Sequence, residues 1–207
     1  MGRSRRERNE RSWPELLELL KERSFRRGRV VLASGKESDF FIDCKQAALT
    51  ARGHRLVGEL MLDALSGLSQ SAEAVAGVAL GGCSLASSVS LMSEVRGRPI
   101  PALYVRKQAK EHGSRRSIEG PHRDGLRVAI LEDVVTTGGS TMRAVESLRQ
   151  AGCEVVGIVT LVDRLEGGLE FLRSQDLEVV SLFTRHDFIP AAETMDADIL
   201  DETLAIE

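Results

Sequence analysis

The sequence predicts an α/β fold in which helices flank a central parallel sheet. Beyond residue 50, short apolar runs alternate with segments whose apolar residues recur at helical spacing. This alternation is typical of parallel strands joined by crossover helices. The runs are also continuously apolar, for example at 128–131, as expected for strands that are covered on both faces.

The elements expected after residue 50 follow one another in a regular order. A first helix is expected at 52–68, where apolar residues from Leu56 to Leu65 share one face. Gly152 is the expected stop of a later helix. The expected strands are 74–80, 102–105, 128–131, 155–162 and 177–183, and the helices between them are 84–95, 140–151 and 165–174.

The first part of the chain does not share this alternation and is expected to form a small hood over the sheet. Ser12 and Glu15 have capping-box spacing before a leucine-rich helix that runs to about Lys21. Apolar runs at 30–33 and 40–43 flank a polar segment and predict a hairpin or a pair of short strands. We therefore expect a single domain over residues 1–207, with the hood mainly at 12–50, the core at about 51–185, and a frayed, arginine-rich tail at 1–11.

Composition and charge narrow the possible classes of function. The chain is 42% hydrophobic and 29% charged, as an ordinary globular protein is. Its net charge of -3 argues against a general nucleic-acid binder, and no apolar run reaches transmembrane or signal-peptide length. Cys44, Cys83 and Cys153 match neither a disulfide framework nor a zinc site, so free thiols in a reducing cytoplasm are expected.

The most informative stretch follows the strand expected at 128–131. Glu132 and Asp133 come directly after it, and residues 136–141 form a loop of Thr, Gly and Ser that opens a helix. Backbone N–H groups at a helix start, together with the helix dipole, can hold a phosphate. Two carboxylates beside such a site suit vicinal hydroxyls or a developing positive charge, and a ribose 5-phosphate offers both. The alternative is an acid pair that caps a helix in an unrelated α/β protein.

This stretch resembles the phosphoribosyl-pyrophosphate signature of type I phosphoribosyltransferases. The resemblance implies the type I phosphoribosyltransferase fold, with Glu132 and Asp133 at the ribose hydroxyls and Asp133 also stabilising positive charge on the sugar. Gly81 and Gly82 correspond to the family's pyrophosphate loop, although such a turn is routine between a strand and a helix. The 5-phosphate would be bound by backbone N–H groups and hydroxyls of Thr136, Thr137, Gly138, Gly139, Ser140 and Thr141, and the preceding Val134 and Val135 are also expected to bind substrate.

A basic segment after the strand expected at 102–105 makes the resemblance specific to one group of phosphoribosyltransferases. A polyanionic leaving group needs several cations, and a mobile loop can deliver them together, although a solvated basic loop is the common alternative. The segment resembles the catalytic loop of orotate phosphoribosyltransferases, which reaches into the neighbouring subunit's site. This implies a homodimer with Lys107 acting across the interface. The residues concerned are Arg106, which would bind substrate, and Lys107, Lys110 and His112, which would be catalytic.

The same resemblance places a flat base between an arginine and the hood. Arg164 resembles the arginine that pairs with the carboxylate of orotate, a group that suits a planar guanidinium, and Thr136 would contact the same ligand. Phe40 and Phe41 resemble the segment that covers the base. The alternatives are a helix-capping arginine and a core aromatic pair.

Two departures from the family pattern concern cations. Some members carry a lysine where Ala33 stands, and it helps to bind the pyrophosphate donor. The chain also lacks the lysine that some relatives use around residues 81–84. Lys36 is expected to bind substrate and to supply the charge that is missing at Ala33.

The resemblance implies transfer of ribose 5-phosphate from phosphoribosyl pyrophosphate to N1 of orotate, giving orotidine 5-phosphate and pyrophosphate in pyrimidine (UMP) biosynthesis. Mg²⁺ is the implied cofactor, held mainly by substrate and water, with no protein metal ligands assigned. We expect a cytoplasmic homodimer without nucleic-acid or membrane partners.

The sequence bears on three alternatives to this function. A purine or uracil phosphoribosyltransferase would share residues 132–141 but would lack the pattern at 107–112 and Arg164. A regulator that senses phosphoribosyl pyrophosphate while binding RNA or DNA is supported only by the arginine-rich tail. A fusion with a decarboxylase barrel is not expected at 207 residues.

Overall fold

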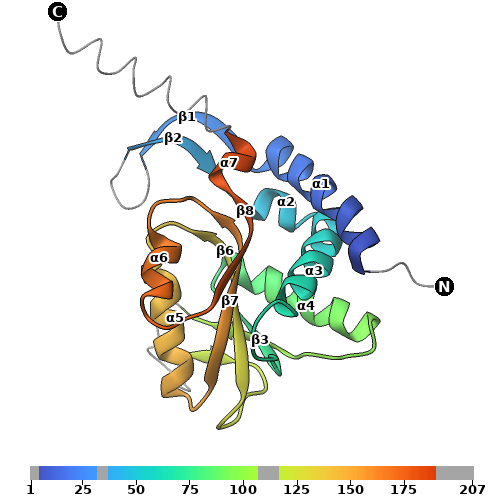
Figure 1. Cartoon of the computed structure of the whole chain (residues 1–207), viewed down its shortest axis with the longest axis vertical. Helices are drawn as coiled ribbons and strands as arrows, with labels where there is room; N and C mark the ends of the chain where they lie inside the picture. Colours follow the sequence, from blue (N-terminus) through green and yellow to red (C-terminus); the bar gives the residue numbers. More distant parts are fainter. Residues whose placement is uncertain (1–4, 32–36, 107–116, 190–207) are drawn as a thin grey trace, which may run out of the picture.

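A computed structural model describes residues 5–31, 37–106 and 117–189, and in it a six-stranded sheet lies between two layers of helices (Figure 1). The strand order is β5-β4-β3-β6-β7-β8, and all neighbours are parallel except β4 and β5. The strands are β3 (Ala74–Val78), β4 (Ala102–Val105), β5 (Ile118–Glu119), β6 (Arg127–Val135), β7 (Glu154–Asp163) and β8 (Val179–Thr184). The predicted α/β class is confirmed, and the sheet is mixed because of the short β5.

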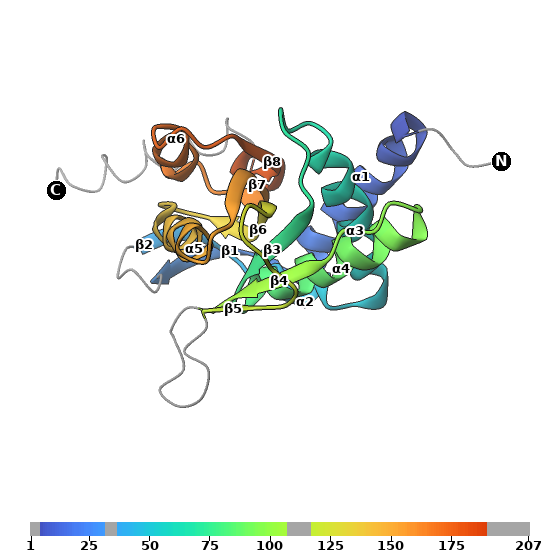
Figure 2. The ribbon, with the colours of Figure 1, turned by 90° about the horizontal axis from the view of Figure 1, so that it is seen from below.

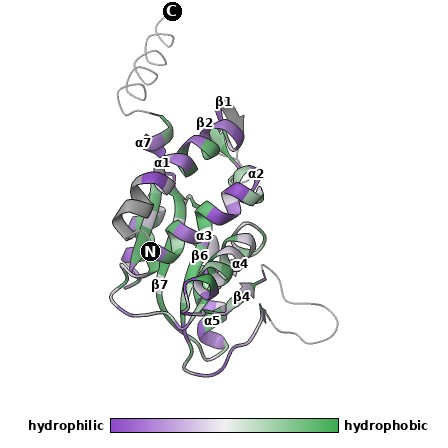
Figure 3. Ribbon diagram, turned by 90° about the vertical axis from the view of Figure 1, so that its right-hand side faces the viewer, coloured by the Kyte–Doolittle hydropathy of each residue, from purple (hydrophilic) through white to green (hydrophobic). Residues whose placement is uncertain are grey.

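The two faces of the sheet bury separate hydrophobic clusters. The helices are α1 (Arg5–Arg23), α2 (Lys45–Ala48), α3 (Ala51–Leu65), α4 (Gly81–Val95), α5 (Gly139–Gln150), α6 (Gly168–Arg173) and α7 (Arg185–Phe188). Ala129 and Leu131 of β6 pack in the cluster of α1, α3 and α4, whereas Val128 and Ile130 pack with α5 and α6. Figure 2 shows these helix groups on opposite sides of the strands, and Figure 3 shows hydrophobic colour along β6 and β7.

The predicted hood is a separate antiparallel pair of strands. β1 (Phe25–Val31) pairs with β2 (Glu37–Ile42), so Phe25 lies opposite Ile42. Ring contacts join Phe25 to Phe188 of α7 and Phe40 to Phe25, with centroids 5.6 Å and 6.1 Å apart. The hood therefore packs on the segment that follows the last strand of the sheet, at the carboxyl ends of the parallel strands (Figure 1).

Several element boundaries differ from the expectations, among them that of β1, which begins at Phe25 rather than at residue 30, and those of α1, β6 and α4. Helix α1 already includes residues 5–11, and Ser12 is not its cap, because the buried Ser12 hydroxyl donates to Glu59 Oε2 of α3 at 3.0 Å. Strand β6 continues to Val135 rather than ending at Leu131, since its pairing with β7 continues that far. Helix α4 begins at Gly81 rather than Ser84. Each boundary depends on a partner distant in the sequence, which local patterns do not report.

No helix among the described residues combines the length and the apolar character that crossing a membrane would require.

Candidate active site

The two adjacent acids lie near the carboxyl end of β6 and point to opposite sides of the strand. Glu132 is 5% exposed, and its Oε2 accepts a hydrogen bond of 2.9 Å from Thr141 Oγ1. Thr141 is fully buried in the first turn of α5. The hydroxyl of Thr141 is thus engaged within the protein, where it ties the end of β6 to the start of α5.

Asp133 lies on the other side, directly against the start of α4. Its Oδ1 accepts a 3.0 Å hydrogen bond from the backbone N–H of Val134. A Cβ atom added to Gly81 would stand only 2.0 Å from Asp133 Oδ2, so only glycine leaves room for this carboxylate. The structure therefore brings the predicted acid pair and the predicted Gly81–Gly82 turn together.

The loop between β6 and α5 leaves the helix start open to an anion. Gly138 has φ +78°, a conformation that favours glycine, and as the N-cap it makes no side-chain hydrogen bond to the N–H groups of the first turn. That turn also contains no acidic residue. Thr136 and Ser140 are half-buried and Thr137 is exposed. Unpaired N–H groups and the positive end of the helix dipole together make an anion-binding site.

Two valines at the end of β6, Val134 and Val135, precede this loop and are held by contacts within the protein. Val135 is buried, and its carbonyl accepts a hydrogen bond of 3.1 Å from the N–H of Arg164. This bond joins the phosphate segment to the segment that follows β7. Val134 is half-buried and packs against the cluster of α1, α3 and α4.

Arg164 is held between the hood and its own loop. Its Nε donates to Glu166 Oε1 at 2.7 Å, and its guanidinium carbon lies 4.1 Å from the centroid of the Phe40 ring. Phe40 is fully buried, whereas Phe41 is 40% exposed. Phe40 thus stacks on the arginine rather than presenting an open face, while Phe41 is accessible. Arg185 also approaches Phe40, at 5.3 Å from the ring centroid.

Sequence reasoning did not single out Glu166, Arg185 or the contact of Cys44 with this site. Glu166 could have been suspected because an acid two positions from an arginine can pair with it. Buried Cys44 lies 3.8 Å, through its Sγ, from the carbonyl oxygen of Asp133. Burial raises the pKa of the Cys44 thiol well above its usual range, and the Asp133 charge adds to this effect. The free state expected for all three cysteines is confirmed.

The basic segment is described only at its first residue. Arg106 follows β4, and its guanidinium pairs with Glu119 of β5 at 2.8 Å. Arg106 and Ser140 line one cavity of about 220 Å³, so the segment begins beside the open start of α5. The remaining predicted cations, Lys36, Lys107, Lys110 and His112, lie outside the described residues.

Known proteins share both the sequence and the fold of this chain. Residues 46–196 match the model of the phosphoribosyl transferase domain family. The chain is 63% identical over 191 residues to the orotate phosphoribosyltransferase of Sorangium cellulosum, covering 91% of this chain and 95% of that protein. The chain belongs to the orotate phosphoribosyltransferase family.

Solved structures of this family have the same fold. The orotate phosphoribosyltransferase of Mycobacterium tuberculosis, in complex with Fe(III) dicitrate, matches with a TM-score of 0.75 at 38% identity, covering 86% of this chain and 99% of that one. The same enzyme in complex with 5-phospho-α-D-ribosyl 1-diphosphate matches with a TM-score of 0.71 at 34% identity, covering 86% and 98%. The prediction of an orotate phosphoribosyltransferase from the sequence is thus confirmed.

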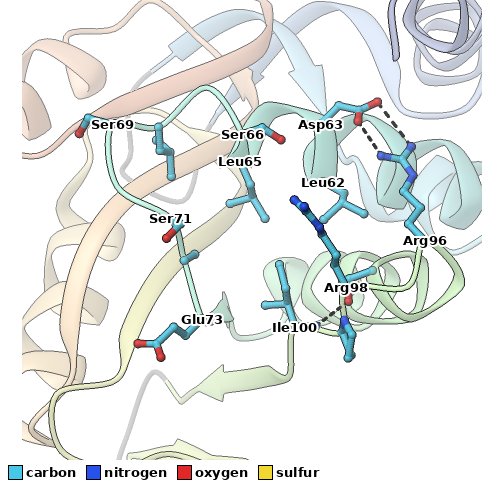
Figure 4. A pocket seen from close by; sticks show the side chains of 14 residues that line it. Leu62, Asp63, Leu65, Ser66, Ser69, Ser71, Glu73, Arg96, Arg98 and Ile100 are labelled. Atoms are coloured by element: carbon cyan, nitrogen blue, oxygen red, sulfur yellow. Dashed lines mark hydrogen bonds and ion pairs between the residues drawn. The ribbon is translucent and has the colours of Figure 1, made fainter. Parts of the chain in front are cut away.

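In this member of the orotate phosphoribosyltransferase family, a second pocket lies at the end of the sheet opposite the candidate active site (Figure 4). It has a volume of about 760 Å³ and opens at the amino ends of β3 and β4. Its charges are largely paired within the protein, Arg96 with Asp63 at 2.6 Å and Glu73 with Arg123 at 3.1 Å. Since ligands of parallel sheets bind at the carboxyl ends, this pocket is not the candidate active site.

The contact between Gly81 and Asp133 generates a first prediction. Gly81→Ala should lower kcat/KM for phosphoribosyl pyrophosphate about a hundredfold, because small displacements of reacting groups carry losses of that order. Steady-state kinetics measure the loss, and circular dichroism shows whether the variant is folded. Cys83→Ala in the same helical turn is the matched control and should retain activity. Wild-type kcat/KM in Gly81→Ala would show that Asp133 need not lie where the structure has it.

Proposed function

We propose that this member of the orotate phosphoribosyltransferase family transfers ribose 5-phosphate from phosphoribosyl pyrophosphate to N1 of orotate at the carboxyl end of β6. The observation that carries the proposal is the pairing of an uncapped helix start with two differently placed acids, Glu132 and Asp133. The complex of the Mycobacterium tuberculosis enzyme with 5-phospho-α-D-ribosyl 1-diphosphate supports the same donor.

The donor's ribose 5-phosphate is proposed to bind between β6 and α5. Backbone N–H groups and hydroxyls from Thr136 to Ser140 hold the 5-phosphate, because the first turn of α5 leaves its N–H groups without a side-chain cap. Asp133 holds ribose hydroxyls and stabilises the positive charge that develops on the sugar in an oxocarbenium-like transition state. Glu132 takes part in ribose binding while its Oε2 orients Thr141.

Orotate is proposed to lie against Arg164 and Phe41, with Thr136 beside it. The planar guanidinium pairs with the carboxylate of orotate, and the Phe40 ring below keeps that group in place. Half-exposed Phe41 is the aromatic residue that can cover the base. This assignment gives Phe40 a supporting position in substrate binding.

The cations of the basic segment are proposed to stabilise the pyrophosphate that leaves. Arg106 binds it from the end of β4, while Lys107, Lys110 and His112 reach it from the following loop and Lys36 reaches it from the hood. Exclusion of water by the hood and the loop protects the sugar cation from hydrolysis.

Magnesium is the proposed cofactor, and the donor set suits it. Within the described part of the chain, no three His, Cys, Asp or Glu side chains cluster as a metal cage. Asp133 is a half-buried carboxylate, and Mg²⁺ usually keeps water and substrate oxygens as its other ligands. When bound, the ion would neutralise charge on the pyrophosphate.

A homodimer is proposed, with a second copy covering exposed apolar side chains just after α2 and on α4. Leu91 and Val95 are 60% and 69% exposed and lie one helical turn apart, on the same face of α4. Leu49, which is 64% exposed, lines a groove together with Leu91. Contiguous exposed apolar residues of this kind mark interaction surfaces.

A cytoplasmic location is proposed from the free cysteines.

The proposed reaction predicts loss of orotate absorbance when phosphoribosyl pyrophosphate and Mg²⁺ are added. Uracil, hypoxanthine and adenine serve as controls and should not be consumed, because they lack the carboxylate that pairs with Arg164. Turnover of a purine or of uracil in place of orotate would contradict the substrate assignment. Donor binding without turnover of any base would favour the sensing function.

The proposed dimer predicts complementation between two inactive variants. Lys107→Ala and Asp133→Asn subunits should each have little activity alone, and mixing them should restore part of it. A mixed dimer then contains one site with an intact Asp133 and an intact Lys107 from the neighbouring subunit. Co-purification of the two subunits through different affinity tags confirms that mixed dimers form. Mixed dimers without restored activity would contradict the action of Lys107 across the interface.

A further inference from the structure

Lys45 lies at the start of α2, where the hood meets the acid pair. The preceding residue, Cys44, is fully buried and contacts the backbone carbonyl of Asp133. Figure 1 shows α2 beside the end of the sheet to which the hood is attached. This placement brings a lysine that no sequence motif singled out to the edge of the candidate site.

The Lys45 ammonium forms an ion pair with one carboxylate and is influenced by the negative charge of a second. Its Nζ donates to Asp43 Oδ1 at 2.5 Å. Burial lowers the pKa of Lys45, but the hydrogen bond with Asp43 and the charges of Asp43 and Asp133 outweigh this effect and raise that pKa. Asp133 itself lies against Gly81, so Lys45, Asp133 and the turn at 81–82 belong to one electrostatic environment.

Release of Lys45 from Asp43 leaves that carboxylate with other partners. Asp43 Oδ1 also accepts from the backbone N–H of Lys45 at 3.2 Å, and Oδ2 accepts from Gln46 Nε2 at 3.2 Å. The Lys45 side chain is 37% exposed, so it has room to turn towards a ligand. A half-exposed ion pair of this kind stabilises a fold by at most about 1 kcal/mol, so a purely structural role for it would be small.

We infer that Lys45 binds the pyrophosphate group of phosphoribosyl pyrophosphate from the hood side, which deepens the proposed function and rests on it. Two positions where relatives carry a lysine for the donor lack it here, at Ala33 and in the turn at 81–84. Lys45 and that turn both lie near Asp133, and Lys45 supplies a positive charge that those positions do not. On binding, its ammonium exchanges the Asp43 carboxylate for an oxygen of the pyrophosphate.

The test is calorimetric titration of the full-length protein with Mg²⁺ and phosphoribosyl pyrophosphate, which does not require turnover. Lys45→Ala should weaken binding about tenfold, the usual consequence of losing one charged contact. Lys45→Arg should retain most of the affinity, because it keeps the charge. Lys21→Ala, which removes a half-exposed lysine of α1 paired with Glu18, is the matched control and should bind as the wild type does.

Inorganic pyrophosphate provides an independent readout as a product inhibitor. Its inhibition constant should rise in Lys45→Ala, whereas KM for orotate should change less than twofold. Wild-type affinity for the donor in Lys45→Ala would overturn the inference, as would equal loss of affinity for donor and orotate. If the wild type consumes orotate and Lys45→Ala binds the donor with unchanged affinity, only the role of Lys45 is overturned. A wild type that binds no donor would overturn both this inference and the proposed function.

Discussion

The hydrogen bond between Glu132 and Thr141 is the constraint on which the rest of the site depends. It is buried and charge-assisted, and such bonds are about twice as strong as neutral ones. It fixes the first turn of α5 to the end of β6, so the unpaired N–H groups of that turn face outward from a defined position. Because adjacent residues of a strand point to opposite sides, the same geometry directs Asp133 towards Gly81.

The hood completes the site from a separate part of the chain. Phe40 lies under the guanidinium of Arg164, and Cys44 contacts the carbonyl of Asp133. A single short segment, from β2 to the start of α2, therefore contacts both the arginine proposed for orotate and the acid proposed for ribose. Small shifts of this segment would change both halves of the site together. Through these two contacts the hood positions groups of the site without containing the reacting groups.

The sequence predicted the fold class, the order of the strands along the chain and the acid pair, because these depend on local patterns. The apolar run before Glu132 and the glycine at 138 are examples, since both are needed for a strand followed by an open helix start. Local patterns do not identify the partners that a side chain contacts in the folded protein. Ser12 resembled a helix cap but bonds to Glu59, and Phe40 resembled an open aromatic face but is buried beneath an arginine. The lysines and the histidine of the basic loop remain predictions.

The most direct test of this account is the affinity of Thr141→Val for phosphoribosyl pyrophosphate, measured by titration beside urea unfolding. Valine matches threonine in shape but cannot donate to Glu132, so unfolding free energy should fall by about 1–3 kcal/mol. Donor affinity should fall at least tenfold because the first turn of α5 loses its attachment to β6, and Thr141→Ser should recover most of it. Wild-type affinity in a folded Thr141→Val protein would show that the phosphate site does not depend on this bond.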